Sequence, residues 1–168
     1  MVEFWSNNDR GYRIRLWIDQ VGQNIQNNTS DVRIRLALLN QGWTFASYQC
    51  SGYVDGFGQR IDYSGSPVML SRNSEIQLID RTITVRHADN GFGVFGVRAH
   101  FNGSGGYSPG NLDISNQDIK LTPIPRGSSV SVAEGFIGNQ VDITIDRKLA
   151  GATPVSYTHL TLPTKLEV

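Results

Sequence analysis

Residues 82–101 read TITVRHADNGFGVFGVRAHF and carry the clearest structural pattern in the chain. Before the central break, apolar Ile83 and Val85 alternate with polar residues, and after it apolar side chains again fall at every second position. A period of two is typical of half-buried strands. The break itself, Ala-Asp-Asn-Gly at 88–91, contains residues that tolerate positive φ. We therefore predict a β-hairpin over 82–101.

Segments on both sides of this stretch repeat the alternation. The spacing predicts strands over 11–20 and 31–40, and shorter strands over 74–80 and 114–122. A polar loop over 21–30 separates the first two. The residues expected to face the core from these first two strands are Tyr12, Ile14, Leu16, Ile18, Val32, Ile34, Leu36 and Leu38.

Between these strands, residues 42–63 are rich in aromatic side chains and glycine. Alternation predicts a strand over 43–48, followed by a hairpin that turns near 55–59. With every predicted element a short strand, the fold class is all-β. We expect an antiparallel β-sandwich, jelly-roll-like, followed by the truncated start of a second, Ig-like β-sandwich.

The composition excludes several kinds of partner. The 168 residues include 15 Lys plus Arg and 15 Asp plus Glu, and this balance argues against binding nucleic acid or an anionic membrane, which favour a basic excess. No stretch has the length and apolarity of a membrane span, and the first residues lack the apolar core of a secretory signal. The single cysteine, Cys50, can form no intrachain disulfide, and we expect it to be a small buried side chain.

Proline marks a boundary near the end of the chain. Pro123 and Pro125 lack the backbone donor that a strand needs, which favours a linker. We predict a β-sandwich domain at 1–122, a Pro-containing linker at 123–127 and an incomplete second β domain at 128–154. The final segment, 155–168, begins VSYTHLTLPT and resembles the translation of a sequencing adapter. We expect it to be a non-native tail.

Catalytic motifs are absent from the sequence. No nucleophile elbow, phosphate loop or zinc-protease helix occurs, and no Cys, Glu or further His lies at metal-ligand spacing from His87 or His100. We interpret these two histidines as a turn cap and a surface residue rather than as a metal or acid–base pair. The prediction is a non-enzyme with no cofactor and no metal.

Two strands share the tetrad Arg-Ile-Arg-Leu, at 13–16 and 33–36. If the strands pair, the outward arginines line one stripe, which either binds acidic groups or is a solvated face balanced by Asp19, Asp31 and other acids. We favour the solvated face. The four arginines are Arg13, Arg15, Arg33 and Arg35.

Several ordered motifs together resemble the N-terminal part of minor structural tail proteins from long-tailed phages of Gram-positive hosts, notably streptococci. These motifs are FWSNN at 4–8, GYRIRL at 11–16, YSGSP at 63–67, TVRHADNG at 84–91, GSGGYSPG at 103–110, IPR at 124–126 and SSV at 128–130. In that family the 84–91 motif usually has Asn or Asp after the histidine and a lysine beyond the turn. Here Ala88 and Phe92 stand at those places.

This resemblance implies a virion component near the tail tip, made in the host cytoplasm, whose partners are other tail subunits and further copies of itself. It also implies a part in tail assembly or in adhesion to host cell-wall polysaccharide. Aromatic side chains offer flat contact area for sugars, so the candidate ligand contacts are Trp43, Tyr53 and Tyr63. For each of them, a place in the β-core is the competing interpretation. The alternative function is the carbohydrate-binding part of a tail-associated glycan hydrolase whose catalytic region is missing.

Overall fold

The computed structural model of the chain describes residues 1–65, 68–104, 108–126, 129–132 and 143–146. The chain divides into two compact units, Met1–Pro125 and Arg126–Val168. Within the described ranges every regular element is a strand, and no helix there is long and apolar enough to cross a membrane.

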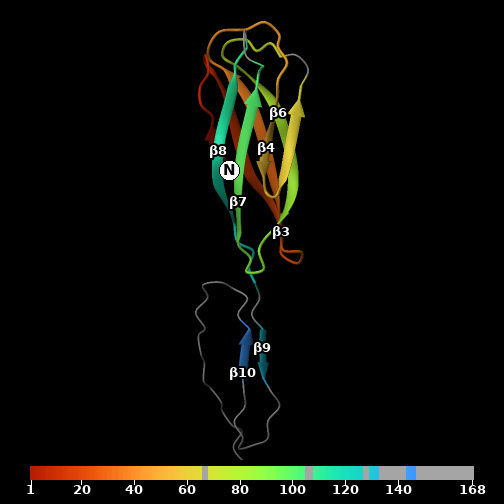
Figure 1. The fold of residues 1–168 in the computed structure, drawn as a ribbon. Helices are drawn as coiled ribbons and strands as arrows, with labels where there is room; N and C mark the ends of the chain where they lie inside the picture. Colours follow the sequence, from red (N-terminus) through yellow and green to blue (C-terminus); the bar gives the residue numbers. More distant parts are fainter. Residues whose placement is uncertain (66–67, 105–107, 127–128, 133–142, 147–168) are drawn as a thin grey trace, which may run out of the picture. The chain divides into compact units, whose positions relative to one another are not determined.

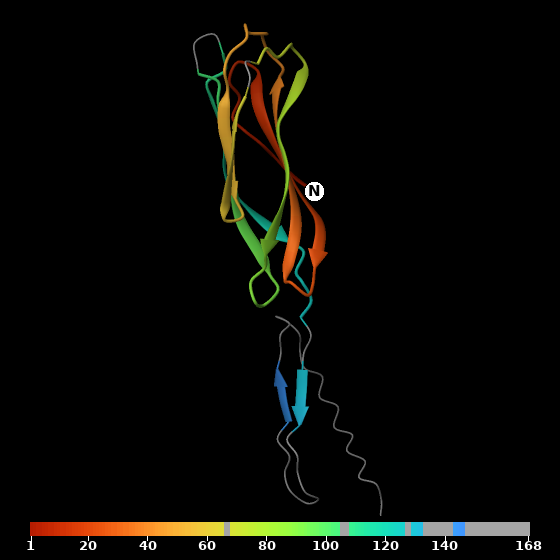
Figure 2. The same cartoon turned by 90° about the vertical axis from the view of Figure 1, so that its right-hand side faces the viewer.

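The first unit is a sandwich of two antiparallel four-stranded sheets that lie face to face (Figures 1 and 2). Sheet I has the strand order β1-β2-β3-β6, and sheet II has the order β5-β4-β7-β8. The strands of sheet I are β1 (Val2–Trp5), β2 (Tyr12–Asn24), β3 (Thr29–Asn40) and β6 (Ser74–Arg86). Those of sheet II are β4 (Ser51–Gly56), β5 (Gln59–Ser64), β7 (Gly93–Asn102) and β8 (Asn111–Leu121). The predicted all-β antiparallel sandwich is confirmed.

The core lies between the sheets and is built from the alternating apolar residues. All eight side chains predicted to face inward from the first two strands are at most 1% exposed. Sheet II contributes Val54, Val97, Phe101 and Leu112, each also at most 1% exposed. Burial of these apolar surfaces is the main stabilising contribution to the sandwich. The lone thiol of Cys50 is buried in the same core, as expected.

The predicted hairpin over 82–101 is wrong. Its two strands exist, but β6 pairs with β3 in sheet I whereas β7 pairs with β4 and β8 in sheet II. The turn after β6 therefore carries the chain from one sheet to the other (Figure 2). Alternation shows that each strand has one buried face, but it does not show which strand is its neighbour. Both strands bury a face in the same core, one from each sheet, so their patterns look like those of a hairpin.

Three smaller predictions also need correction. The predicted strand over 43–48 is absent, and only Tyr48 makes an isolated bridge, to Val68. The polar loop over 21–30 is shorter than expected, because β2 continues past a bulge to Asn24 and β3 begins at Thr29. The short strand over 74–80 is the first part of the 13-residue β6.

Side chains of the N-terminal segment form hydrogen bonds to the backbone at the start of β8, an edge strand of sheet II. Asn7 donates to the carbonyl oxygen of Asn111 (3.2 Å) and accepts from the amide of Asp113 (2.7 Å), as a neighbouring strand would. Asp9 accepts from the amide of Gly110 (2.7 Å). These bonds satisfy backbone groups at the start of β8 and fix the position of Asp113.

The second unit contains one described pair of strands, β9 (Ser129–Val132) and β10 (Ile143–Asp146), which are antiparallel. Completion or truncation of an Ig-like sandwich there stays a prediction. Residues 155–168, expected to be non-native, lie outside the described residues.

Candidate functional site

The outward face of sheet II carries polar side chains in rows that cross the strands. The backbone register aligns Asp62, Tyr53, His100 and Asp113 in one row across β5, β4, β7 and β8. We call these four residues the tall row. On one side of it lies a row of shorter side chains, the short row, formed by Ser64, Ser51, Asn102 and Asn111. On the other side lie Arg60, Asp55 and Arg98.

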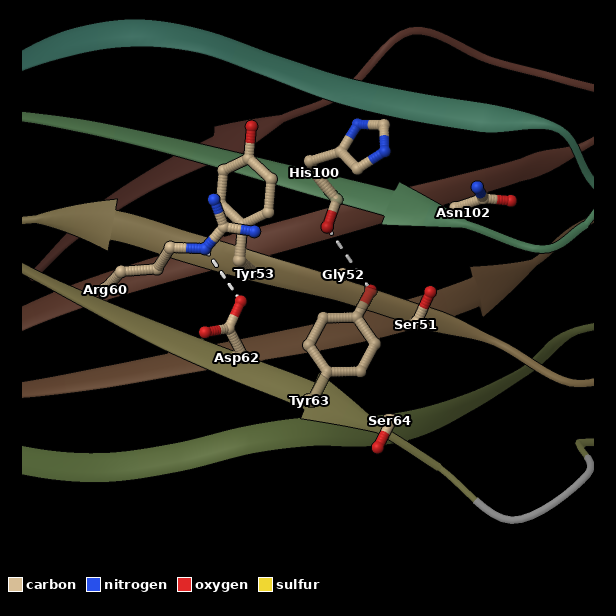
Figure 3. Close-up of a pocket in the computed structure, with 9 residues that line it drawn as sticks. All are labelled: Ser51, Gly52, Tyr53, Arg60, Asp62, Tyr63, Ser64, His100 and Asn102. Carbon is tan, nitrogen blue, oxygen red and sulfur yellow. Dashed lines mark hydrogen bonds and ion pairs between the residues drawn. The ribbon is translucent and has the colours of Figure 1, made fainter.

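A hollow of about 390 Å³ forms between the tall row and the short row. The tall row lines it with Asp62, Tyr53 and His100, and the short row with Ser64, Ser51 and Asn102. Arg60, Gly52 and Tyr63 complete the lining (Figure 3). The difference in side-chain length creates it, because serine and asparagine stand beside tyrosine, histidine and arginine. We call it the sheet II hollow.

Tyr53 forms the centre of the tall row. The guanidinium carbon of Arg60 lies 3.8 Å from the centre of its ring, and Figure 3 shows this side chain extended across the ring. The His100 ring lies 5.5 Å away on the neighbouring strand. Arg60 is held there by a 2.7 Å bond from its Nε to Asp62. The cation therefore covers one face of Tyr53, which leaves the ring edge and the hydroxyl for contact with a ligand.

His100 is oriented by its neighbour in the row. Its Nδ1 lies 2.6 Å from Oδ1 of Asp113, and a carboxylate at that distance accepts a proton. The proton is thereby assigned to Nδ1. In Figure 3 one ring nitrogen points along β7 toward Asn102. Nε2 has no hydrogen-bond partner in the part of the chain that the structure describes, so it is available at the sheet II hollow.

Tyr63 reaches the hollow from the opposite face of the sheet. It alternates inward with Ile61 and packs against the core, and its hydroxyl lies 3.4 Å from the carbonyl oxygen of His100. A Cβ atom on Gly52 would lie 2.5 Å from this hydroxyl and would overlap the same carbonyl. Glycine at 52 thus permits the contact. Burial raises the pKa of Tyr63 above the ordinary tyrosine range, so the hydroxyl stays protonated.

Trp43 is placed apart from the other two candidate contacts. Its side chain is 81% exposed in the connection between β3 and β4 and does not line the hollow. Its backbone is anchored, because the carbonyl oxygen lies 3.0 Å from the Tyr12 hydroxyl and 3.2 Å from the Asn40 amide nitrogen. The structure therefore brings Tyr53 and Tyr63 together and leaves Trp43 outside.

Three of the four arginines in the stripe on sheet I are paired with acids. Arg15 contacts Glu3 at 2.6 Å, Arg35 contacts Asp19 at 2.9 Å, and Arg33 makes two bonds to Asp80. Arg15 also lies over the rings of Trp5 and Trp17, 4.9 and 4.3 Å from their centres. This network supports the solvated, charge-balanced interpretation of the stripe.

The other histidine of the sandwich, His87, lies away from the hollow. His87 is buried in the turn after β6, as expected for a turn-capping residue, and no group of three or more His, Cys, Asp or Glu in the described ranges is placed to hold a metal ion. Sequence reasoning missed Ser51, Asp62 and Asn102 at the hollow. In the sequence these residues are marked only by their position: they fall on the outward-facing side of the alternating segments 51–64 and 98–102. That position does not reveal which strands are neighbours.

The solved structure described as X-ray structure of Northeast Structural Genomics Consortium target SoR45 aligns with a TM-score of 0.39 and 12% identity. The alignment covers 70% of this chain and 90% of that chain. No match was found among curated proteins. The model of a family described as siphovirus protein of unknown function (DUF859) matches residues 1–161. The match includes residues 155–161, which belong to the segment that we expected to be non-native. The non-native origin of residues 155–168 stays a prediction. The suspected relationship to siphovirus proteins is confirmed: the chain belongs to the siphovirus family DUF859.

Proposed function

We propose that this chain is a structural component of the phage tail, near the tip, that attaches to polysaccharide on the host surface. Family membership supports a phage structural protein. The observation that carries the adhesion role is the sheet II hollow, an open, polar recess with an aromatic side chain at its centre. Recesses with a few convergent polar groups are the usual place for small ligands.

We further propose that the chain is not itself a hydrolase. A glycosidase needs one carboxyl group kept protonated as an acid, usually by apolar surroundings. At the hollow, the side chains of Asp62 and Asp113 are 66% and 60% exposed, so neither lies in the apolar surroundings that such an acid needs. In the proposed virion the chain also contacts other tail subunits and further copies of itself.

Binding of the chain to cells tests the adhesion role. The complete 168-residue chain is labelled and incubated with intact streptococcal cells and with cells stripped of wall polysaccharide. Saturable binding that disappears on stripping is the expected result. Equal binding to stripped cells would show that the surface partner is not polysaccharide, and no binding to any candidate host would instead favour a scaffold that contacts only tail proteins.

A further inference from the structure

We propose that the sheet II hollow binds one neutral, hydroxyl-rich sugar ring of the host glycan. This identification of the ligand rests on the adhesion role proposed above and deepens it. The size of the hollow, about 390 Å³, lies near the lower end of the range for small-molecule sites. It suits a single sugar ring rather than a long segment of polymer.

The short row supplies polar groups without partners. The side-chain hydroxyls of Ser51 and Ser64 make no hydrogen bond within the described residues. Asn102 uses its amide oxygen to accept from the backbone of Ser104 at 2.7 Å, so its NH2 group is left as a donor. Sugar hydroxyls both donate and accept, and this mixed set matches them.

The tall row adds acceptors on the opposite wall. Nδ1 of His100 faces Asp113, so Nε2 is the ring nitrogen left to contact a ligand hydroxyl. Asp62 uses Oδ1 to accept from Arg60 and has a second carboxylate oxygen to offer. Its side chain is 66% exposed, so a ligand in the hollow can reach it.

The charges around the hollow disfavour an anionic ligand. Arg60 is engaged with Asp62 and with the Tyr53 ring, and Arg98 donates twice to Asp55 (3.1 and 2.8 Å). Carboxylates stand at both ends of the tall row, in Asp62 and Asp113. A phosphate or carboxylate would face these acids, and among the described residues that line the hollow the one cation, Arg60, is already paired with Asp62. A neutral ring avoids that repulsion.

Titration of the folded, isotope-labelled chain with defined probes tests this identification. The neutral probes are the methyl pyranosides of glucose, galactose and rhamnose, and the anionic probes are glucuronic acid and glycerol 3-phosphate. Amide shifts are followed in wild type, in Ser51→Val and in the matched control Ser115→Val. Valine is favoured in strands, and Ser115 lies on β8 outside the hollow, so both variants are expected to retain the wild-type fold.

We expect a neutral probe to shift amides of β4 and β7 around the hollow. Binding should weaken at least about tenfold in Ser51→Val, which fills the hollow and removes a hydroxyl, and should be unchanged in Ser115→Val. Shifts with the anionic probes only, or neutral-probe binding equal in all three proteins, would overturn the inference. If cells are still bound in a polysaccharide-dependent way after such a result, the adhesion role stands and only the ligand class is wrong.

Discussion

Nδ1 of the buried His87 lies 2.9 Å from the carbonyl oxygen of Gly91, across the turn that joins sheet I to sheet II. Since a carbonyl only accepts, Nδ1 carries the proton, and Nε2 accepts from the Ser30 hydroxyl at 2.7 Å. The same carbonyl accepts from the amide of Ile124 at 2.9 Å. The imidazole thus connects β3 to the turn, and the Gly91 carbonyl connects the turn to the segment after β8.

Replacing this imidazole should destabilise the first unit. His87→Ala leaves the Ser30 hydroxyl and the Gly91 carbonyl without their buried partner, and we expect a loss of about 2 kcal/mol in the free energy of unfolding. Urea unfolding followed by tryptophan fluorescence measures it. His100→Ala, at a partly exposed histidine, is the control and should stay within about 0.5 kcal/mol. Equal effects of the two changes would contradict the role of His87.

Gly52 should tolerate no side chain. In Gly52→Ala the new methyl group overlaps the His100 carbonyl and meets the Tyr63 hydroxyl, so β4 and β7 must separate locally. We expect a loss of about 2 kcal/mol or more in unfolding free energy. Gly65→Ala is the matched control, because its Cβ would lie at an ordinary 3.6 Å from Sγ of Cys50. A Gly52→Ala protein as stable as Gly65→Ala would contradict the geometry.

Most strands of the sandwich could be predicted from the sequence, but their pairing could not. Alternation correctly identified β2, β3 and β7 and their inward faces, because burial on one side leaves a period of two, but it divided β6 into two strands. It could not identify partners: β6 and β7 are adjacent in the chain, yet the turn at His87 places them in different sheets. In the predicted strand at 43–48, the Trp43 carbonyl accepts from the side chains of Tyr12 and Asn40, and only Tyr48 pairs with another backbone segment, at Val68, so no strand forms.

The candidate site was predictable only in part. Tyr53 and Tyr63 are predicted ligand contacts because they are aromatic, and the structure places both at one hollow. Trp43 met the same criterion and lies elsewhere. The hollow itself depends on register, which sets Ser51 opposite Ser64 and Asn102, and no local pattern encodes that alignment.

The N-terminal strand should loosen in acid. Hydrogen bonding from Arg15, with further bonds from Trp5 and Trp17, lowers the pKa of Glu3 below its ordinary value. A carboxyl whose pKa falls on folding stabilises the fold above its unfolded pKa of about 4.3, and that contribution is lost as pH falls through the folded value. The indole N–H signals of Trp5 and Trp17 should therefore shift with a midpoint below about pH 4.3. This transition should vanish in Glu3→Gln, and a midpoint above that value would be inconsistent with the network.

Cys50 should be chemically silent in the folded protein. Its side chain is 4% exposed, and burial raises the pKa of its thiol, so little reactive thiolate is present near neutral pH. A thiol reagent such as DTNB should react slowly with native protein and rapidly in denaturing urea. As Cys50 is the single cysteine, the signal reports this site alone. Rapid reaction of the native protein would contradict its burial.

The measurement that tests the central claim most directly compares Ser51→Val with Ser115→Val in binding to intact and polysaccharide-stripped host cells. Both variants lose a serine hydroxyl from the outward face of sheet II, but only the first alters the hollow. We predict that Ser51→Val loses most of the polysaccharide-dependent binding while Ser115→Val binds like wild type. Undiminished binding by Ser51→Val would contradict the claim that this hollow is where the chain attaches to its host.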